Sequence, residues 1–115
     1  MCGIIGYIGE KRVSGILMNG LKRMEYRGYD SAGLSIIEND RIKTIKKKGK
    51  VSELENLVDH SSVSATIGIA HTRWATHGFP NDINAHPHHD NSNSISIVHN
   101  GIIENYSSLK TKLKS

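Results

Sequence analysis

Apolar residues and glycines alternate at the start of the chain. Ile4, Ile5, Tyr7 and Ile8 stand among glycines at positions 3, 6 and 9. This pattern predicts a buried strand over residues 3–9, with glycines where another segment approaches the backbone closely.

Apolar residues next recur at helical spacing, and Gly28 follows this stretch. A glycine directly after a periodic run is typical of a helix end. The spacing predicts an amphipathic helix over residues 12–26. Its core stripe is Val13, Ile16, Leu17, Leu21 and Met24.

Short apolar runs separated by turn residues continue the pattern. Residues 33–38 and 41–48 flank Asn39-Asp40, which predicts a hairpin with a tight turn. Ser52 and Glu55 have the spacing of a capping box and predict the start of a short helix. Its apolar side is Leu54, Leu57 and Val58.

Two further buried strands are predicted in the second half, over residues 66–70 and 95–99. The polar run 90–94 is a turn that precedes the second of them. A last helix is predicted from about residue 105 or 107, with Leu109 and Leu113 on its inner face. No strand follows it, so we interpret the chain as a cut segment.

Composition narrows the class of protein. A chain of 115 residues with 37% hydrophobic content and 11 glycines is typical of one soluble α/β domain. The single cysteine excludes an internal disulfide and favours a reducing, cytoplasmic compartment. No apolar run reaches the roughly 18–20 residues that span a membrane. The first residues are also unlike a signal peptide.

Positive charge is concentrated in one part of the chain. The formal net charge is +4, and residues 11–50 hold eleven of the fifteen Lys and Arg residues. Nucleic-acid binding would favour aromatic residues within such a patch. No aromatic residue lies between Tyr29 and Trp74. The patch is therefore interpreted as a solvated face, with no nucleic-acid partner.

Cys2 follows Met1 directly, and Gly3 comes next. Removal of Met1 would leave a thiol and a free α-amine on one residue. Such an amine can act as the base for the adjacent nucleophile, without a separate histidine. The alternative is that Cys2 is a small buried apolar residue without chemistry.

Thiol attack on an amide also needs donors for the oxyanion. Asn100-Gly101, at the end of a predicted strand, offers a side-chain amide and a backbone N–H. The same dipeptide is favoured in type I′ turns, and taken alone it favours a turn.

Residues 71–78 follow a predicted strand and are rich in polar groups. Arg73 has the planar fork that suits a carboxylate. Thr76 and His77 add donors, and Trp74 has a ring large enough to cover a small site. The alternative is a structural arginine beside a surface tryptophan.

Six of the seven histidines lie between residues 71 and 99. Their spacing does not match a zinc site, and the one cysteine lies far away in the sequence. Pro87 also interrupts any helix that would align His86 with His88. We predict no metal site and interpret these histidines as turn residues and site-wall residues.

Five blocks of sequence carry a family resemblance: residues 2–6, 25–33, 69–78, 84–88 and 98–105. Together, and in this order, they resemble the class II glutamine amidotransferases, which are N-terminal-nucleophile hydrolases. The resemblance covers essentially the whole chain.

Within this family, residues 26–30 and 72–76 favour the hexosamine-forming branch. Amidophosphoribosyltransferases and asparagine synthetases share the N-terminal cysteine and the Asn-Gly pair, but their block after the first helix usually reads differently. A non-catalytic remnant and an amidophosphoribosyltransferase remain the alternative interpretations.

The resemblance implies a role for each matching residue. Cys2, after loss of Met1, attacks the carboxamide of L-glutamine, and Asn100 and the Gly101 N–H bind the oxyanion. Other matching positions bind the substrate or flank the nucleophile. These are Arg73 and Thr76 at the α-carboxylate, His77 beside them, Trp74 in a covering loop, and Arg27 and Gly28 next to Cys2.

The resemblance also implies a fold and its limits. The expected fold is an α/β, α-β-β-α layered sandwich, of which residues 1–115 would be roughly the first half of a glutaminase domain. No cofactor is implied. Fructose 6-phosphate would bind only to sugar-isomerase domains absent from this chain, and the parent protein is expected to be a homodimer.

Overall fold

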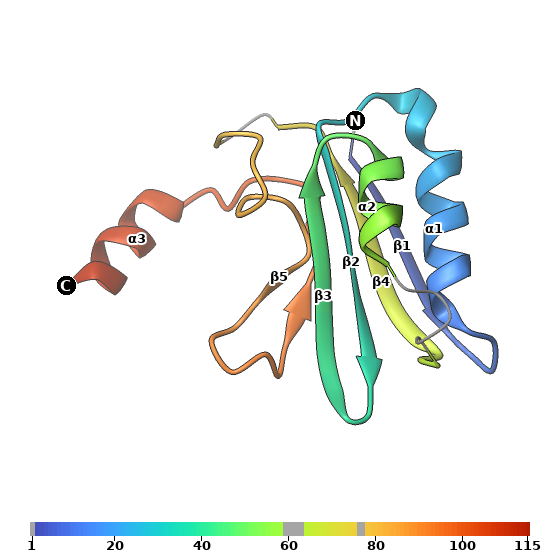
Figure 1. The fold of residues 1–115 in the computed structure, drawn as a ribbon. Helices are drawn as coiled ribbons and strands as arrows, with labels where there is room; N and C mark the ends of the chain where they lie inside the picture. Colours follow the sequence, from blue (N-terminus) through green and yellow to red (C-terminus); the bar gives the residue numbers. More distant parts are fainter. Residues whose placement is uncertain (1, 59–63, 76–77) are drawn as a thin grey trace.

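A computed structural model describes residues 2–58, 64–75 and 78–115. Its main feature is a four-stranded antiparallel sheet of order β1-β4-β2-β3. Helices α1 and α2 cover one face of this sheet, a two-stranded sheet of β5 and β6 lies against the other, and α3 stands apart (Figure 1). The strands are β1 (Gly3–Ile8), β2 (Ser31–Glu38), β3 (Arg41–Lys48), β4 (Ile67–Arg73), β5 (His88–His89) and β6 (Ser96–Ile97). The helices are α1 (Val13–Arg23), the 3₁₀ turn η1 (Glu25–Arg27), α2 (Val51–Leu57) and α3 (Tyr106–Lys114).

The core lies between the sheet and the two helices α1 and α2. Successive strand residues point to opposite faces, so Ala32, Leu34 and Ile36 of β2 all face the helices. Leu17 and Leu21 of α1 pack against them, and both are fully buried. Met18 and Met24 also belong to this core, as filler residues.

The opposite face of the sheet carries polar residues in its centre. Gly33 of β2 pairs with His71 of β4, and residues that pair directly share a face. Ser35 lies on the same face, where its hydroxyl is 2.7 Å from that of Ser96 in β6. Residues 83–97 therefore cover the centre of this face, which is called the site face below.

The hairpin of β2 and β3 is confirmed. Asn39 and Asp40 both have positive φ angles, of 53° and 60°. Two consecutive left-handed residues form the type I′ geometry that a two-residue hairpin loop requires.

In the N-terminal half of the chain, two predictions about secondary-structure elements are wrong. β1 is an edge strand, not a buried one: Ile4 and Ile8 are 47% and 78% exposed because they lie on the site face, away from α1. α2 is capped at Lys50, whose N–H donates to the carboxylate of Glu53 at 3.2 Å. The predicted pair of Ser52 and Glu55 is not the capping box.

Two further corrections concern the C-terminal half. The strand predicted over residues 95–99 is reduced to Ser96 and Ile97, which pair only with β5. In α3 the predicted inner residues are exposed, Leu109 at 41% and Leu113 at 85%, because α3 packs on neither sheet. The helical spacing of apolar residues predicts which side of a helix is apolar, but it does not show whether another part of the protein packs against that side.

Candidate active site

The central strand β4 extends into the segment that was predicted to follow it. His71, Thr72 and Arg73 pair with β2, and His71 and Thr72 also pair with β1. The predicted strand 66–70 is therefore too short, since polar residues continue the ladder. His71 and Arg73 point to the site face, where both are buried.

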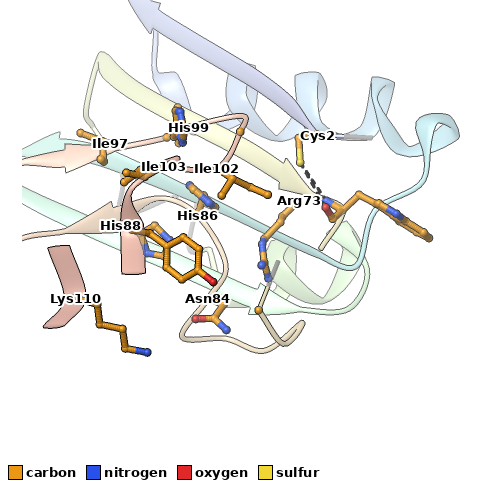
Figure 2. Close-up of a pocket in the computed structure, with 15 residues that line it drawn as sticks. Cys2, Arg73, Asn84, His86, His88, Ile97, His99, Ile102, Ile103 and Lys110 are labelled. Carbon is orange, nitrogen blue, oxygen red and sulfur yellow. Dashed lines mark hydrogen bonds between the residues drawn. The ribbon is translucent and has the colours of Figure 1, made fainter. Parts of the chain in front are cut away.

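A pocket of about 770 Å³ opens on the site face at this end of the sheet (Figure 2). Cys2, Arg73, Trp74 and Gly101 all line it. The fold thus brings together four residues that the sequence selected from three distant segments. Thr76 and His77 lie outside the described residues.

The thiol of Cys2 is held by the backbone of Trp74. The Trp74 N–H donates to Cys2 Sγ at 3.3 Å, and the thiol faces the Trp74 carbonyl oxygen at 3.8 Å (Figure 2). Arg27 donates from Nη2 to the Cys2 carbonyl oxygen at 3.3 Å. Arg27 therefore lies beside the cysteine, as expected.

Gly28 also lies near the site, through Trp74. Its φ is +79°, and a Cβ at this position would lie 3.8 Å from the indole ring. The Trp74 side chain is 52% exposed. The ring therefore rests over Gly28 at the rim of the pocket.

Arg73 is 8% exposed, and its Nη1 donates to the Phe79 carbonyl oxygen at 3.1 Å. Asn84 donates to the same oxygen at 3.0 Å. The two side chains thus anchor the loop that follows β4 at one point. Asn84 lines the pocket and was given no role from sequence, although it falls in the fourth resembling block.

Asp30 holds the segment after β4 from the other side. Its backbone N–H donates to the Arg73 carbonyl at 2.7 Å, and its Oδ2 accepts from the Ala75 N–H at 2.6 Å. Sequence reasoning assigned Asp30 no role. The only signal was its place within residues 25–33, a resembling block.

Three histidine rings contact one another in a row beside the pocket. His71 and His86 have ring centroids 4.4 Å apart, and His86 and His88 are 4.3 Å apart. His86, His88 and His99 line the pocket, where the sequence placed histidines as site-wall residues. Among the described residues, no group of three or more His, Cys, Asp or Glu is arranged to hold a metal ion.

Burial and nearby positive charge favour the neutral form of these imidazoles, because both lower their pKa values. Burial, the largest cause, lowers the pKa of His71 and of His88. The pKa of His86 falls to about 3, mainly through burial and then through neighbouring His71 and His88. Neutral rings can each donate one hydrogen bond and accept another.

The Asn-Gly pair does not form the alternative hairpin turn. In the described structure Gly101 has a φ of +148°, and residues 102–105 form no strand. Gly101 lines the pocket, whereas the side chain of Asn100 accepts a hydrogen bond from His71 at 2.7 Å. The arrangement leaves a backbone N–H and an amide NH₂ in the loop beside the pocket.

No family model matches the chain. It is 59% identical, over its whole length, to the "Glutamine--fructose-6-phosphate aminotransferase [isomerizing]" of Bacteroides thetaiotaomicron. It is 60% identical, over 98% of its length, to the enzyme of the same name from Chlorobaculum tepidum. The chain spans about a fifth of the length of these curated relatives, 19% of each.

A solved structure shows the same fold. The glutamine phosphoribosylpyrophosphate amidotransferase of B. subtilis, complexed with ADP and GMP, superimposes with a TM-score of 0.79 at 26% identity. The match covers 99% of this chain and 25% of that chain. In the part of the chain that is described, no helix has the length and apolar character to cross a membrane.

Proposed function

Because the chain belongs to the class II glutamine amidotransferases, we propose that it carries the nucleophile and part of the glutamine pocket of an enzyme that makes glucosamine 6-phosphate. The observation that carries this proposal is the pocket, in which the Cys2 thiol, buried Arg73 and the Gly101 loop meet. Its acceptor would be fructose 6-phosphate, as the printed names of the relatives imply.

The proposed reaction has two stages. After Met1 is removed, the Cys2 α-amine takes the thiol proton, and Sγ attacks the carboxamide carbon of glutamine. The oxyanion forms opposite Asn100 Nδ2 and the Gly101 N–H. The carbon–nitrogen bond then breaks, ammonia leaves with the proton from the amine, and water hydrolyses the thioester to glutamate.

Arg73 is proposed to bind the α-carboxylate of glutamine, together with Thr76 and with His77 close by. Arg73 suits this role because a planar guanidinium in a buried wall binds carboxylates in a fixed orientation. Trp74 would belong to the loop that covers the bound substrate, and its position over Gly28 supports this.

The layered sandwich is also a proposal. One layer of helices and one sheet are described, and β5 and β6 begin a second layer on the site face. Ile4, Ile8 and Ile37 on this face are exposed, which is unfavourable for apolar residues left in water. We propose that further strands of the complete protein extend the second layer over them. That the complete protein forms a homodimer also remains a prediction.

The acceptor separates this proposal from the amidophosphoribosyltransferase alternative. Sequence identity favours the fructose 6-phosphate enzymes, with 59–60% against 26% for the solved amidotransferase. The two acceptors are distinguished by supplying each to the complete protein with glutamine and identifying the aminated product. Formation of phosphoribosylamine only would overturn our choice.

The test of the site itself is Cys2→Ala in the complete protein. We expect loss of glutamate release and of glutamine-dependent synthesis, by about 10⁴-fold or more, since the nucleophile is removed. Synthesis from added ammonium salt should remain. N-terminal mass analysis must first show that Met1 is absent in the wild type. Undiminished glutamine use by Cys2→Ala would refute the mechanism.

A further inference from the structure

His71 is the one fully buried histidine side chain among the described residues that contacts the Asn-Gly loop. Its Nε2 lies 2.7 Å from Asn100 Oδ1. This bond joins the central strand β4 to residues 98–103, which form no regular structure. The orientation of the exposed Asn100 side chain is therefore tied to a rigid part of the sheet.

The direction of this hydrogen bond follows from the surroundings of the ring. His71 Nδ1 is buried and has no hydrogen-bond partner within the described residues. A buried N–H without an acceptor is rarer than a buried acceptor without a donor. In neutral His71 the proton is thus favoured on Nε2, where Asn100 Oδ1 accepts it. Burial lowers the pKa of His71 and keeps the ring in this neutral form.

The ring itself has little freedom to turn. Its neighbour His86 lies with its centroid 4.4 Å away and its plane tilted by 32°. Both faces of β4 are inside the fold at this point, since Ala70 and Thr72 are buried as well. The donor at Nε2 is therefore held in place before any substrate binds.

A side-chain amide has two ends of nearly equal size and opposite hydrogen-bonding character. Only the NH₂ end can stabilise a negative oxygen. We propose that His71 is a positioning residue that binds the oxygen end of Asn100 and thereby presents its NH₂ to the oxyanion. This inference rests on the proposed function and names a residue to which the family resemblance assigned no role.

The experiment is a double-mutant cycle in the complete protein, with glutamate release as the readout. Asn100→Ala should lower kcat by about 10²–10³-fold, as for other oxyanion donors. His71→Leu, which has no donor, should lower kcat by about ten- to a hundredfold with the KM for glutamine nearly unchanged. In the Asn100→Ala background, His71→Leu should cost less than about threefold, because the amide it orients is gone.

Two further variants keep the test decisive. His71→Gln retains an amide that can donate to Asn100 and should recover at least part of the kcat lost in His71→Leu. The same cycle is run with His71→Ala, which also has no donor, if the leucine variant does not fold. His89→Leu is the matched control: His89 is exposed, and within the described structure its ring contacts the neighbouring Asp90 carbonyl oxygen and not the Asn-Gly loop, so kcat should not change.

Alkylation of Cys2 by iodoacetamide distinguishes a misfolded His71 variant from one that has lost only the orientation of Asn100. This reaction forms no oxyanion, so its rate in a folded His71 variant should match the wild type. Equal losses of kcat from His71→Leu with and without Asn100 would overturn the positioning role. Retention of glutamate release by Cys2→Ala would instead show that the proposed function has failed, whatever the His71 variants do.

Discussion

At the scale of single residues, the proposed chemistry depends on how Cys2 is held beside the pocket. Its side chain accepts from the Trp74 N–H, and its carbonyl accepts from Arg27, each at 3.3 Å. Side chain and backbone are thus fixed independently. The proposed role as a terminal nucleophile needs this, because chain ends are otherwise poorly ordered.

Arg73→Lys tests the proposed carboxylate-binding role. Lysine keeps the positive charge but lacks the planar guanidinium group. Its single ammonium group cannot bind the Phe79 carbonyl oxygen and the substrate carboxylate in the same geometry. We expect the KM for glutamine to rise by about 10- to 100-fold, since a hydrogen bond to a charged group is worth roughly 1.5–3 kcal/mol. Steady-state kinetics on the complete protein measures this.

The matched control is Arg41→Lys at the exposed start of β3, which should leave kcat and KM unchanged. A loss confined to kcat in Arg73→Lys, with KM unaltered, would count against carboxylate binding and would place Arg73 in the stabilisation of the transition state.

At the residue scale, short motifs in the sequence selected residues that the fold brings together. Cys2, Arg73, Trp74 and Gly101 line one pocket, although their roles stay predictions. The positioning role proposed for His71 was not predicted from the sequence, because it depends on a contact across 29 residues. No spacing along the chain encodes such a contact.

At the scale of elements, predictions were accurate where local geometry decides the outcome. The type I′ turn fixes the hairpin of β2 and β3 through its own two residues. The length of β6 depends instead on its partner β5, which has two residues. Similarly, the exposure of α3 depends on which surfaces lie near it, and no pattern within residues 106–114 contains that information.

Gly33→Ala tests how closely β2 and the site loop approach one another. A Cβ at Gly33 would overlap the His86 carbonyl oxygen and lie 2.7 Å from Lys46 Cβ. Strand and loop would have to separate, so we expect a loss of about 1–3 kcal/mol in the free energy of unfolding. The KM for glutamine should also rise, because His86 and Asn84 line the pocket.

Urea unfolding followed by circular dichroism measures the first effect, and initial rates measure the second. Gly6→Ala is the control in the same sheet, since its Cβ would meet no atom of the described residues within 4 Å. Equal stability of the two variants would contradict the close approach at Gly33.

At the scale of the whole molecule, the site face gathers one buried histidine, two half-buried histidines and two cations from four segments. His71 comes from β4, His88 from β5 and His86 from the loop between these strands. Arg73 and Lys46 lie close enough to lower the pKa of His86 further. Lys46 Nζ also donates to the carbonyl oxygens of Ile83 and Ala85, at 3.0 and 2.9 Å. The ammonium group of Lys46 therefore holds the loop between β4 and β5 against β3.

This arrangement sets the direction of the pH dependence. The pKa of His86 is about 3 in the folded chain, against an ordinary value of 6.5. Between these two pH values the unfolded chain binds a proton that the folded chain does not. Stability from this group is therefore fully present above pH 6.5 and is lost progressively as the pH falls towards 3. His71 and His88, whose pKa values are also lowered, act in the same direction.

We accordingly expect the free energy of unfolding to fall between pH 7 and pH 5, with each fully linked histidine contributing up to about 1.4 kcal/mol per pH unit. His86→Gln should reduce this slope by at most the contribution of one linked proton, about 1.4 kcal/mol per pH unit. His89→Gln, at the exposed position of β5 three residues further along the chain, should leave the slope unchanged. The midpoint of urea unfolding, measured at several pH values, gives the slope for both variants. The pH dependence from His86 arises only in the folded chain, because the site face buries the ring only there. A slope in His86→Gln equal to that of the wild type would show that this ring is solvated and titrates at its ordinary pKa.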